Sequence, residues 1–297
     1  MKILNFGSCN IDYVYSLDHI VRPGETETSS SMAVFPGGKG LNQSIALARA
    51  GAAVYHGGCV GEDGSFLKQL LFSDGVDVSC VDTVEGKNGH AIIQLSREGE
   101  NSIFLYPGSN HCVTKERIDR ILSRFSAGDV LLAQNEISEL PYLVEAAWQK
   151  GMEIYLNPSP MNATIGMLDL QKISCLILNE VEAADISGAS EVEDILTWFA
   201  ERYPNLQLML TLGGRGCVYS CGAVRLHHPI FPVQVVDTTA AGDTFTGYFI
   251  AGIAAGLPME QVLQRASCAA AIAVSRKGAA PSVPDAAEVE QTLRKWV

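Results

Sequence analysis

The sequence predicts an α/β fold, with a mainly parallel central sheet flanked by helices and a small β-sheet beside it. Short apolar runs alternate with amphipathic helical patterns along most of the 297 residues. Strands joined by helices form crossover units, and these pair in parallel. Hydrophobic residues make up 47% of the chain and charged residues 18%, a balance that suits a large core and excludes extended disorder. We expect a single domain over 1–297.

The alternation of elements starts at the N-terminus. Residues 2–8 and 53–59 are short apolar runs that predict buried strands. The segment 41–50 repeats apolar residues at helical spacing and stops at Gly51. The same reasoning predicts further helices at 65–73, 139–150, 192–203, 242–256 and 258–275, and further strands at 130–133, 153–156, 176–178 and 208–211.

Two regions lack any helical period. Residues 13–32 are polar, and residues 91–105 consist of two strand-like runs joined by a hairpin signal at 97–100. We expect these regions to form a small antiparallel sheet, built from about 12–35 and 88–106. Such a sheet beside a cleft serves as a lid or as a dimer surface.

Charge and composition exclude several classes of protein. The formal net charge is −12 and no basic stripe is present, so we expect no nucleic-acid partner. No apolar stretch reaches the roughly 20 residues that span a bilayer, so we expect no membrane segment. The start of the chain lacks the features of a signal peptide. The eight cysteines form no CxxC pair, which favours reduced, buried thiols over a zinc site and predicts a cytoplasmic protein.

The strongest local motif lies at 236–245. A strand is expected to end near Val236, small residues follow, and a helix begins around Gly242. The N-terminus of a helix presents unpaired N–H groups that suit a phosphate. Asp243 stands in the first turn, where a carboxylate accepts a proton from an attacking hydroxyl. Complementing the helix dipole is an equally good explanation of Asp243 from this segment alone.

Four other segments carry weaker signals. Residues 36–43 are glycine-rich and open a helix, but they lack Walker A spacing. Asn10 and Asp12 follow the first strand, at the edge of the sheet where ligands bind. The segment 179–182 begins a helix, and 211–216 is a glycine-containing loop between two strands. A polar turn, a helix cap or a plain loop explains each of them when it is taken alone.

In combination, these segments resemble a known family. GGKGLNQS (37–44) and DTTAAGDTF (237–245) resemble the two signatures of the ribokinase-like family of carbohydrate kinases. Other segments match family motifs in the same order: GSCNID (7–12), PGET (23–26), NPSP (157–160), LNEVEA (178–183), TLGGRG (211–216) and RKGAAPSVP (276–284). The resemblance implies a ribokinase-like fold with a lid, and transfer of phosphate from ATP to the primary hydroxyl of a small sugar. D-ribose is the expected sugar, and a homodimer through the lid is the expected assembly.

The resemblance also implies roles for individual residues. Asp243 would be the catalytic base, with Ala240, Ala241 and Gly242 as the anion hole. The sugar pocket would consist of Asn10, Asp12, Gly38, Lys39, Asn42, Glu136 and Asp243. ATP would contact Asn179, Thr211, Gly213, Gly216, Gly242 and Ser267. Glu182 would organise Mg²⁺ through water. A K⁺ ion would be surrounded by Asp237, Thr239, Ala273, Arg276, Gly278 and Ser282, mostly through backbone oxygens.

Some positions depart from the family pattern. Ala240 stands where the family usually has glycine, and Ser267 where a histidine often lies near the adenine. Alternative functions on the same scaffold are a kinase for fructose, deoxyribose, psicose or an adenosine-like nucleoside, or a non-catalytic regulator that binds sugar or nucleotide. A dinucleotide-dependent dehydrogenase is disfavoured because no G-x-G-x-x-G follows the first strand.

Overall fold

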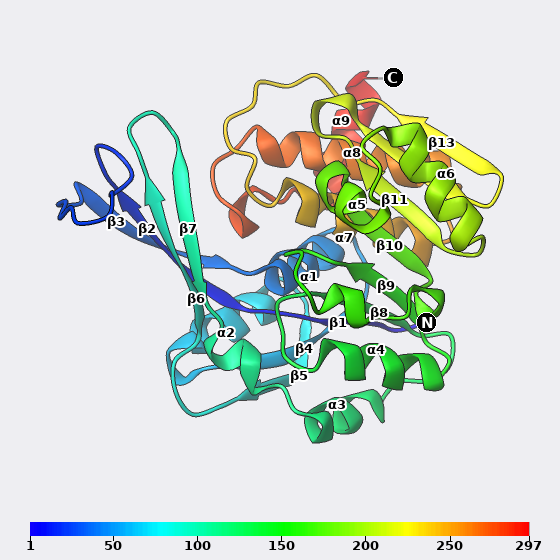
Figure 1. Cartoon of the computed structure of the whole chain (residues 1–297), viewed down its shortest axis with the longest axis horizontal. Helices are drawn as coiled ribbons and strands as arrows, with labels where there is room; N and C mark the ends of the chain where they lie inside the picture. The colour runs from blue at the N-terminus through cyan, green and yellow to red at the C-terminus, as the bar shows by residue number, and fades with distance from the viewer. Residues whose placement is uncertain (297) are drawn as a thin grey trace.

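The computed structural model describes residues 1–296, which form two separate sheets (Figure 1). In this part of the chain the larger sheet has nine strands, in the order β13-β12-β11-β10-β9-β8-β1-β4-β5. The seven strands that follow β12 in this order are parallel to one another. Only the pairs β11–β12 and β12–β13 are antiparallel. The prediction of a mainly parallel sheet is therefore confirmed. The strands are β1 (Ile3–Phe6), β4 (Val54–Val60), β5 (Asp77–Thr83), β8 (Val130–Gln134), β9 (Glu153–Asn157), β10 (Cys175–Asn179), β11 (Gln207–Thr211), β12 (Cys217–Cys221) and β13 (Val224–His228).

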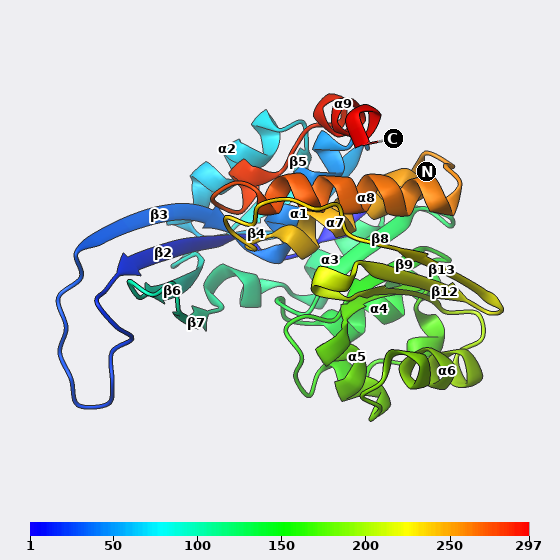
Figure 2. The ribbon, with the colours of Figure 1, turned by 90° about the horizontal axis from the view of Figure 1, so that it is seen from above.

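Helices cover both faces of this sheet (Figure 2). Consecutive residues of the central strands enter opposite cores: Leu131 packs into one and Leu132 into the other. Burial on both faces explains why these strands are continuous apolar runs. One face is covered by α1 (Lys39–Arg49), α2 (Ser65–Ser73), α7 (Ala241–Ala254), α8 (Met259–Val274) and α9 (Ala286–Trp296). The other is covered by α3 (Lys115–Leu122), α4 (Leu140–Gln149), α5 (Glu180–Ser187) and α6 (Val192–Arg202).

The smaller sheet projects from one side of the body (Figure 1). It contains β2 (Asn10–Ser16), β3 (Ser31–Gly37), β6 (Gly89–Leu95) and β7 (Asn101–Tyr106), in the order β3-β2-β6-β7. Each hairpin is antiparallel, but β2 and β6 pair in parallel, so the sheet is mixed rather than wholly antiparallel. The reason is that each hairpin leaves the body on its first strand, and those two strands start side by side at Asn10 and Gly89.

The strand expected to end near Val236 does not form, and this prediction is wrong. After β13 ends at His228, residues 229–237 follow an irregular path. Pro229 and Pro232 lack the N–H groups that a paired strand needs. The backbone of the segment is instead fixed at its far end, where the N–H groups of Val236 and Asp237 donate to the Val274 carbonyl at 2.8 and 3.1 Å.

Over residues 1–296, no helix has both the length and the apolar character needed to cross a bilayer. All eight cysteines are free thiols, and six of them are buried. Burial raises the pKa of the Cys59 and Cys217 thiols to about 11, so these side chains stay neutral.

Candidate active site

The candidate residues gather along one edge of the large sheet. Asn10 and Glu136 lie just beyond the ends of β1 and β8, while Asn179 and Thr211 end β10 and β11. These four strands are parallel, so their carboxyl ends meet at the same edge. Ligands of open α/β sheets bind at that edge.

Two close contacts bring α1 and α7 to this edge. A Cβ atom on Gly247 of α7 would lie 2.4 Å from the Cβ of Ala46 and 2.8 Å from the backbone nitrogen of Leu47. A Cβ atom on Gly40, in the first turn of α1, would lie 2.5–2.6 Å from the backbone of Gly7. Only glycine permits such approaches, which seat α1 between β1 and α7. The first turns of both helices therefore meet.

Asp243 lies where these two helices meet, in the first turn of α7. Its Oδ2 accepts a hydrogen bond from Asn42 Nδ2 at 3.0 Å, and its Oδ1 accepts one from Gln43 Nε2 at 2.8 Å. The side chain is buried, yet both oxygens are paired with donors. Gln43 was not among the predicted site residues. The available signal was a run of three polar side chains, at 42–44, just before the apolar part of α1.

A second group of charges surrounds Glu136. Its Oε2 accepts hydrogen bonds from the Lys39 N–H at 3.1 Å and from the Ser8 hydroxyl. Burial raises the pKa of Glu136. Burial also raises the pKa of Asp12 to about 7, and the nearby Glu136 carboxylate adds to this shift. Lys39 is affected in both directions: burial lowers its pKa, but Asp243, Glu136 and Glu182 together raise it above the ordinary value, so it remains protonated.

Asn10 is oriented by a residue that the sequence did not single out. Asn110 Nδ2 donates to Asn10 Oδ1 at 2.7 Å, and Asn110 Oδ1 accepts from the Cys9 N–H at 3.0 Å. The neighbouring strand passes close to this pair, since a Cβ on Gly89 would lie 2.1 Å from Asn110 Nδ2. Gly38 begins α1 with a φ of 94°, a left-handed conformation that favours glycine. Its role in the structure is therefore to make the turn that presents Lys39 and Asn42.

A cavity of about 540 Å³ lies beside the start of α7. Five of the predicted ATP contacts line it: Thr211, Gly213, Gly216, Gly242 and Ser267. Its apolar wall comes from the irregular segment 229–237, with Ile230, Phe231, Val233 and Val235 facing the cavity. That wall was not predicted, because the segment was expected to be a strand. The cavity has the size and apolar lining of a site for a small-molecule ring.

A smaller cavity of about 230 Å³ shares Thr211, Thr238 and Gly242 with the larger one. It is lined by Lys39, Asn179, Glu182, Ala240 and Asp243. Asn179 and Glu182 also form a capping box on α5, with reciprocal bonds of 2.9 and 3.0 Å. The helix cap that the sequence left open as an alternative is therefore present, and the same two residues face the cavity.

The predicted K⁺ residues are only partly brought together. Asp237 accepts hydrogen bonds from Thr239 N, Thr239 Oγ1 and Gly278 N, at 2.9, 2.6 and 2.9 Å. Burial raises the pKa of Asp237, but these bonds and Lys277 outweigh it and lower that pKa overall. Other members make different contacts: the Ala273 carbonyl accepts from the Arg276 N–H, the Arg276 side chain pairs with Glu288, and the Ser282 hydroxyl donates to the Ala279 carbonyl.

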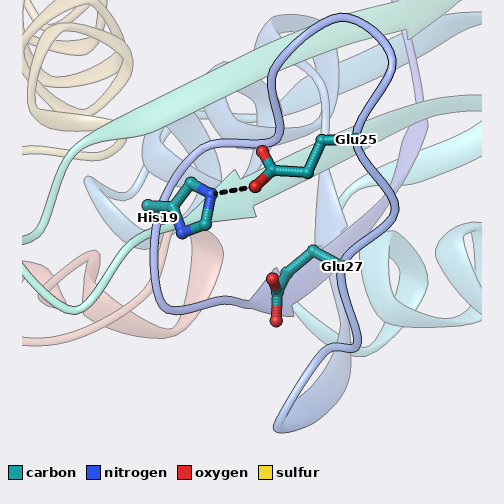
Figure 3. Close-up of side chains that lie close together, drawn as sticks. All are labelled: His19, Glu25 and Glu27. Atoms are coloured by element: carbon teal, nitrogen blue, oxygen red, sulfur yellow. Dashed lines mark hydrogen bonds and ion pairs between the residues drawn. The ribbon is translucent and has the colours of Figure 1, made fainter.

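One further cluster lies away from this edge, on the exposed loop between β2 and β3. His19 Nε2 contacts Glu25 Oε1 at 2.9 Å, and Glu27 lies beside them (Figure 3). The backbone N–H of Arg22 and the His19 imidazole lower the pKa of Glu25. Exposed acidic groups gather in this way without a metal, and we assign the cluster no ligand.

Comparison with known proteins gives a consistent result. Residues 1–286 match the family described as "pfkB family carbohydrate kinase". A Bacillus subtilis protein named ribokinase is 34% identical over 98% of this chain and 99% of its own. The structure of a Cryptococcus neoformans ribokinase with ADP has a TM-score of 0.85 at 33% identity, covering 98% of this chain and 99% of its own. An Arabidopsis thaliana ribokinase with ribose and ATP has a TM-score of 0.87 at 29% identity, covering 99% and 98%.

Proposed function

This chain belongs to the pfkB family of carbohydrate kinases, and we propose that it transfers the γ-phosphoryl group of ATP to the primary hydroxyl of D-ribose. The observation that carries this proposal is the place of Asp243. It lines the smaller cavity, and the residue before it, Gly242, lines both cavities. A carboxylate at that junction would lie between the bound nucleotide and the sugar. The similarity to proteins named ribokinase supports D-ribose as the sugar.

In the proposed reaction, Asp243 acts as the general base. The sugar hydroxyl oxygen forms a bond to the γ-phosphorus, its proton passes to Asp243, and the bond from the γ-phosphorus to the ADP oxygen breaks. The backbone N–H groups of 240–242 would stabilise the charge that develops on the transferred group. The Ala241 N–H donates to the Thr238 carbonyl at 3.3 Å, a long bond that a phosphate oxygen would replace. Lys39, protonated beside Asp243, would supply further positive charge.

The sugar pocket is proposed to lie between the two sheets. Asn10 and Asp12 start β2, Gly38, Lys39 and Asn42 start α1, and Glu136 follows β8. Asn42 Oδ1 is buried and has no donor among the described residues, so it is available to a sugar hydroxyl. Asn179 and the 211–216 loop would hold ATP, with Ser267 beside the base. The small sheet would close over the sugar as a lid and exclude water.

Two cations are proposed. Mg²⁺, when bound with ATP, neutralises part of the phosphate charge, and Glu182 would hold it through water. The donor set fits, because Glu182 places a carboxylate in the cavity beside Asn179 and oxygen is the ligand that Mg²⁺ prefers. K⁺ would lie near Asp237 and 273–282. Three protein donors already occupy the Asp237 carboxylate, so coordination of K⁺ would depend mostly on backbone oxygens.

We also propose a cytoplasmic homodimer that pairs through the small sheet. Both faces of β7 are exposed, since the consecutive residues Ile103, Phe104 and Leu105 are each more than half exposed. Met32 and Val34 on β3 add to this apolar surface. A second copy would bury these side chains and cover the open strand edges. The eight free thiols are in keeping with a reducing compartment.

The decisive experiment is a phosphorylation panel. ADP release is measured with ATP and, in turn, D-ribose, deoxyribose, fructose, psicose and adenosine, with and without Mg²⁺, and with K⁺ or a bulky organic cation. We expect the highest kcat/KM for D-ribose, phosphate on its primary hydroxyl by NMR, and loss of activity without Mg²⁺. ADP release that no sugar raises above the sugar-free rate would contradict the proposal. Equal rates in both monovalent cations would remove the K⁺ site.

A further inference from the structure

A string of buried amide side chains leads away from Asp243 into the core. Gln43 Nε2 donates to Asp243 Oδ1 at 2.8 Å, and Gln134 Nε2 donates to Gln43 Oε1 at 2.7 Å. Gln134 Nε2 also donates to Asn5 Oδ1 at 2.8 Å. Asn5 Nδ2 in turn donates to the Gly40 carbonyl and to Ser44 Oγ, both at 2.8 Å. Asn5, Gln43 and Gln134 have no exposed surface, so water does not compete for these bonds.

The string has a fixed direction. Gln43 must present its NH₂ group to Asp243, because its carbonyl oxygen would repel a carboxylate. The Oε1 atom of Gln43 then faces Gln134, which must donate from its NH₂ group. If the Gln134 amide were reversed, its Oε1 would face two acceptors, Gln43 Oε1 and Asn5 Oδ1. Each amide therefore fixes the orientation of its neighbour, and the last amide, that of Gln43, donates to Asp243.

This orientation leaves one polar atom without a partner. Gln134 Oε1 is buried and receives no hydrogen bond within residues 1–296. It lies against Gly7, where a Cβ atom would be 2.1 Å away. An unpaired buried acceptor costs about 1–3 kcal/mol. The fold accepts this cost, because Gly7 has no side chain and both hydrogens of Gln134 Nε2 are bonded to Gln43 and Asn5.

We propose that Gln134 and Asn5 are positioning residues for phosphoryl transfer: acting through Gln43, they hold the Asp243 carboxylate in the orientation that accepts the sugar proton. This inference rests on the proposed function and extends it to two side chains that line neither of the cavities described above. The string lies under α1 and contacts Asp243 only through Gln43. Its members should therefore affect the rate of transfer and leave the binding of sugar and ATP unchanged.

The test is a kinetic double-mutant cycle on Gln43 and Gln134. Gln134→Leu keeps the approximate size and removes the donor. We expect kcat with D-ribose to fall about tenfold, with both KM values within about twofold of wild type, because misorientation of a reacting group lowers the rate of the chemical step. In a Gln43→Leu background, where the string is already cut, Gln134→Leu should lower kcat no further. Gln134→Met, which has a similar length and no N–H or O–H donor, should lower kcat by about as much.

Leu132→Ala is the matched control. Leu132 lies two residues before Gln134 on β8, is fully buried and enters the core on the same side of the sheet. This variant should lose stability and keep a near-normal kcat. If Gln134→Leu does not fold, Asn5→Leu and Gln134→Met test the same connection.

Three results would overturn the inference: a normal kcat in Gln134→Leu, effects of Gln43 and Gln134 that multiply in the double variant, or a change confined to KM. An inactive wild type would overturn the proposed function and this inference together. An active wild type with an unaffected Gln134→Leu variant would overturn this inference alone.

Discussion

At the scale of single residues, the environment of Asp243 favours the proposed role as a base over that of a helix cap. Amide donors on α1 bind both of its oxygens, and such pairing is unnecessary for an acid that only complements a helix dipole. The carboxylate also faces the cavity that Lys39 and Glu182 line. Local sequence could not distinguish these roles, because the partners lie about 200 positions away in the chain.

Replacing Asp243 by Asn removes the basicity and keeps the size. General-base loss lowers rates by roughly 10²–10⁴, so we expect kcat to fall by about that factor while sugar and ATP still bind. A helix-dipole role predicts instead a loss of about 0.3–1 kcal/mol in stability with kcat nearly unchanged. Steady-state kinetics and thermal unfolding of the same variant distinguish the two. A stable Asp243→Asn protein with near-normal kcat would rule out the mechanism.

Asp12 should give the proposed sugar site a pH dependence. With a pKa of about 7, it is protonated below neutrality and charged above it in the folded protein. A carboxylate accepts stronger hydrogen bonds from hydroxyl groups than a neutral acid does. The kcat/KM for sugar should therefore rise as the pH increases through about 7, and Asp12→Asn should flatten that rise.

The same variant should raise the sugar KM by about tenfold, in line with a lost bond worth about 1–3 kcal/mol, and leave the ATP KM unchanged. Asp18→Asn, at an exposed aspartate that pairs with Arg97, is the matched control and should behave as wild type. An unchanged sugar KM in Asp12→Asn would remove Asp12 from the site.

Ala240 is one of two non-glycine residues with positive φ among residues 1–296. Its φ of 58° places it in the left-handed region, which costs a side-chain-bearing residue about 1–2 kcal/mol. Ala240→Gly removes that strain but adds freedom to the unfolded chain. We expect the free energy of unfolding to rise by about 1 kcal/mol and kcat to be kept or raised, as denaturant unfolding and sugar kinetics would measure. A clear loss of stability would mean that Ala240 is unstrained.

At the scale of secondary-structure elements, the contact between α1 and α7 determines the geometry of the site. Gly247 lies one turn after Asp243, and Ala46 lies one turn after Asn42. The close approach at Gly247 and Ala46 therefore sets the distance between the base and its donors.

Gly247→Ala should force the two helices apart. The added Cβ would lie 2.4 Å from the Ala46 Cβ, well inside contact distance. Overpacking of this kind costs about 1–3 kcal/mol. We expect a matching loss in the free energy of unfolding and a lower kcat, because Asn42 and Gln43 would move away from Asp243.

Gly252→Ala, on the same helix, is the control. The atoms nearest to its Cβ would be those of the Val262 side chain, at 3.1 Å or more, so kcat should change little. Equal kcat in both variants and wild type would contradict the argument.

At the scale of the whole molecule, the small sheet is the part that the body does not cover. Its apolar side chains predict self-association, and a charge placed among them should prevent it. We expect wild type to sediment as a dimer at micromolar concentration and Phe104→Asp to sediment as a monomer, because burying a charge at an interface is unfavourable. Phe72→Asp, at a still more exposed position on α2, should remain a dimer. A monomeric wild type would exclude pairing through this sheet.

The sequence by itself determined the order and type of most main elements, but not β5, α3 and α9. It also determined the two segments of the small sheet and the helix starts that carry Asn42, Glu182 and Asp243. These features depend on residues close together in the chain: apolar period, glycine turns and capping side chains. Local pattern failed at 229–237, where apolar residues suggested a strand but two prolines prevent pairing. That segment became the wall of the larger cavity.

Only the tertiary structure decided which polar residues act together. Asn5, Gln43 and Gln134 come from two strands and one helix, and each is unremarkable in its own segment, yet together they connect to Asp243 on α7. They meet because Gly7, Gly40 and Gly247 let α1 pack closely against both β1 and α7. The same holds for Asn10 and Asn110, which are joined by a hydrogen bond across 100 positions of chain. Hydrogen bonds act over about 3 Å in space, so partners that are distant in sequence leave no local signal.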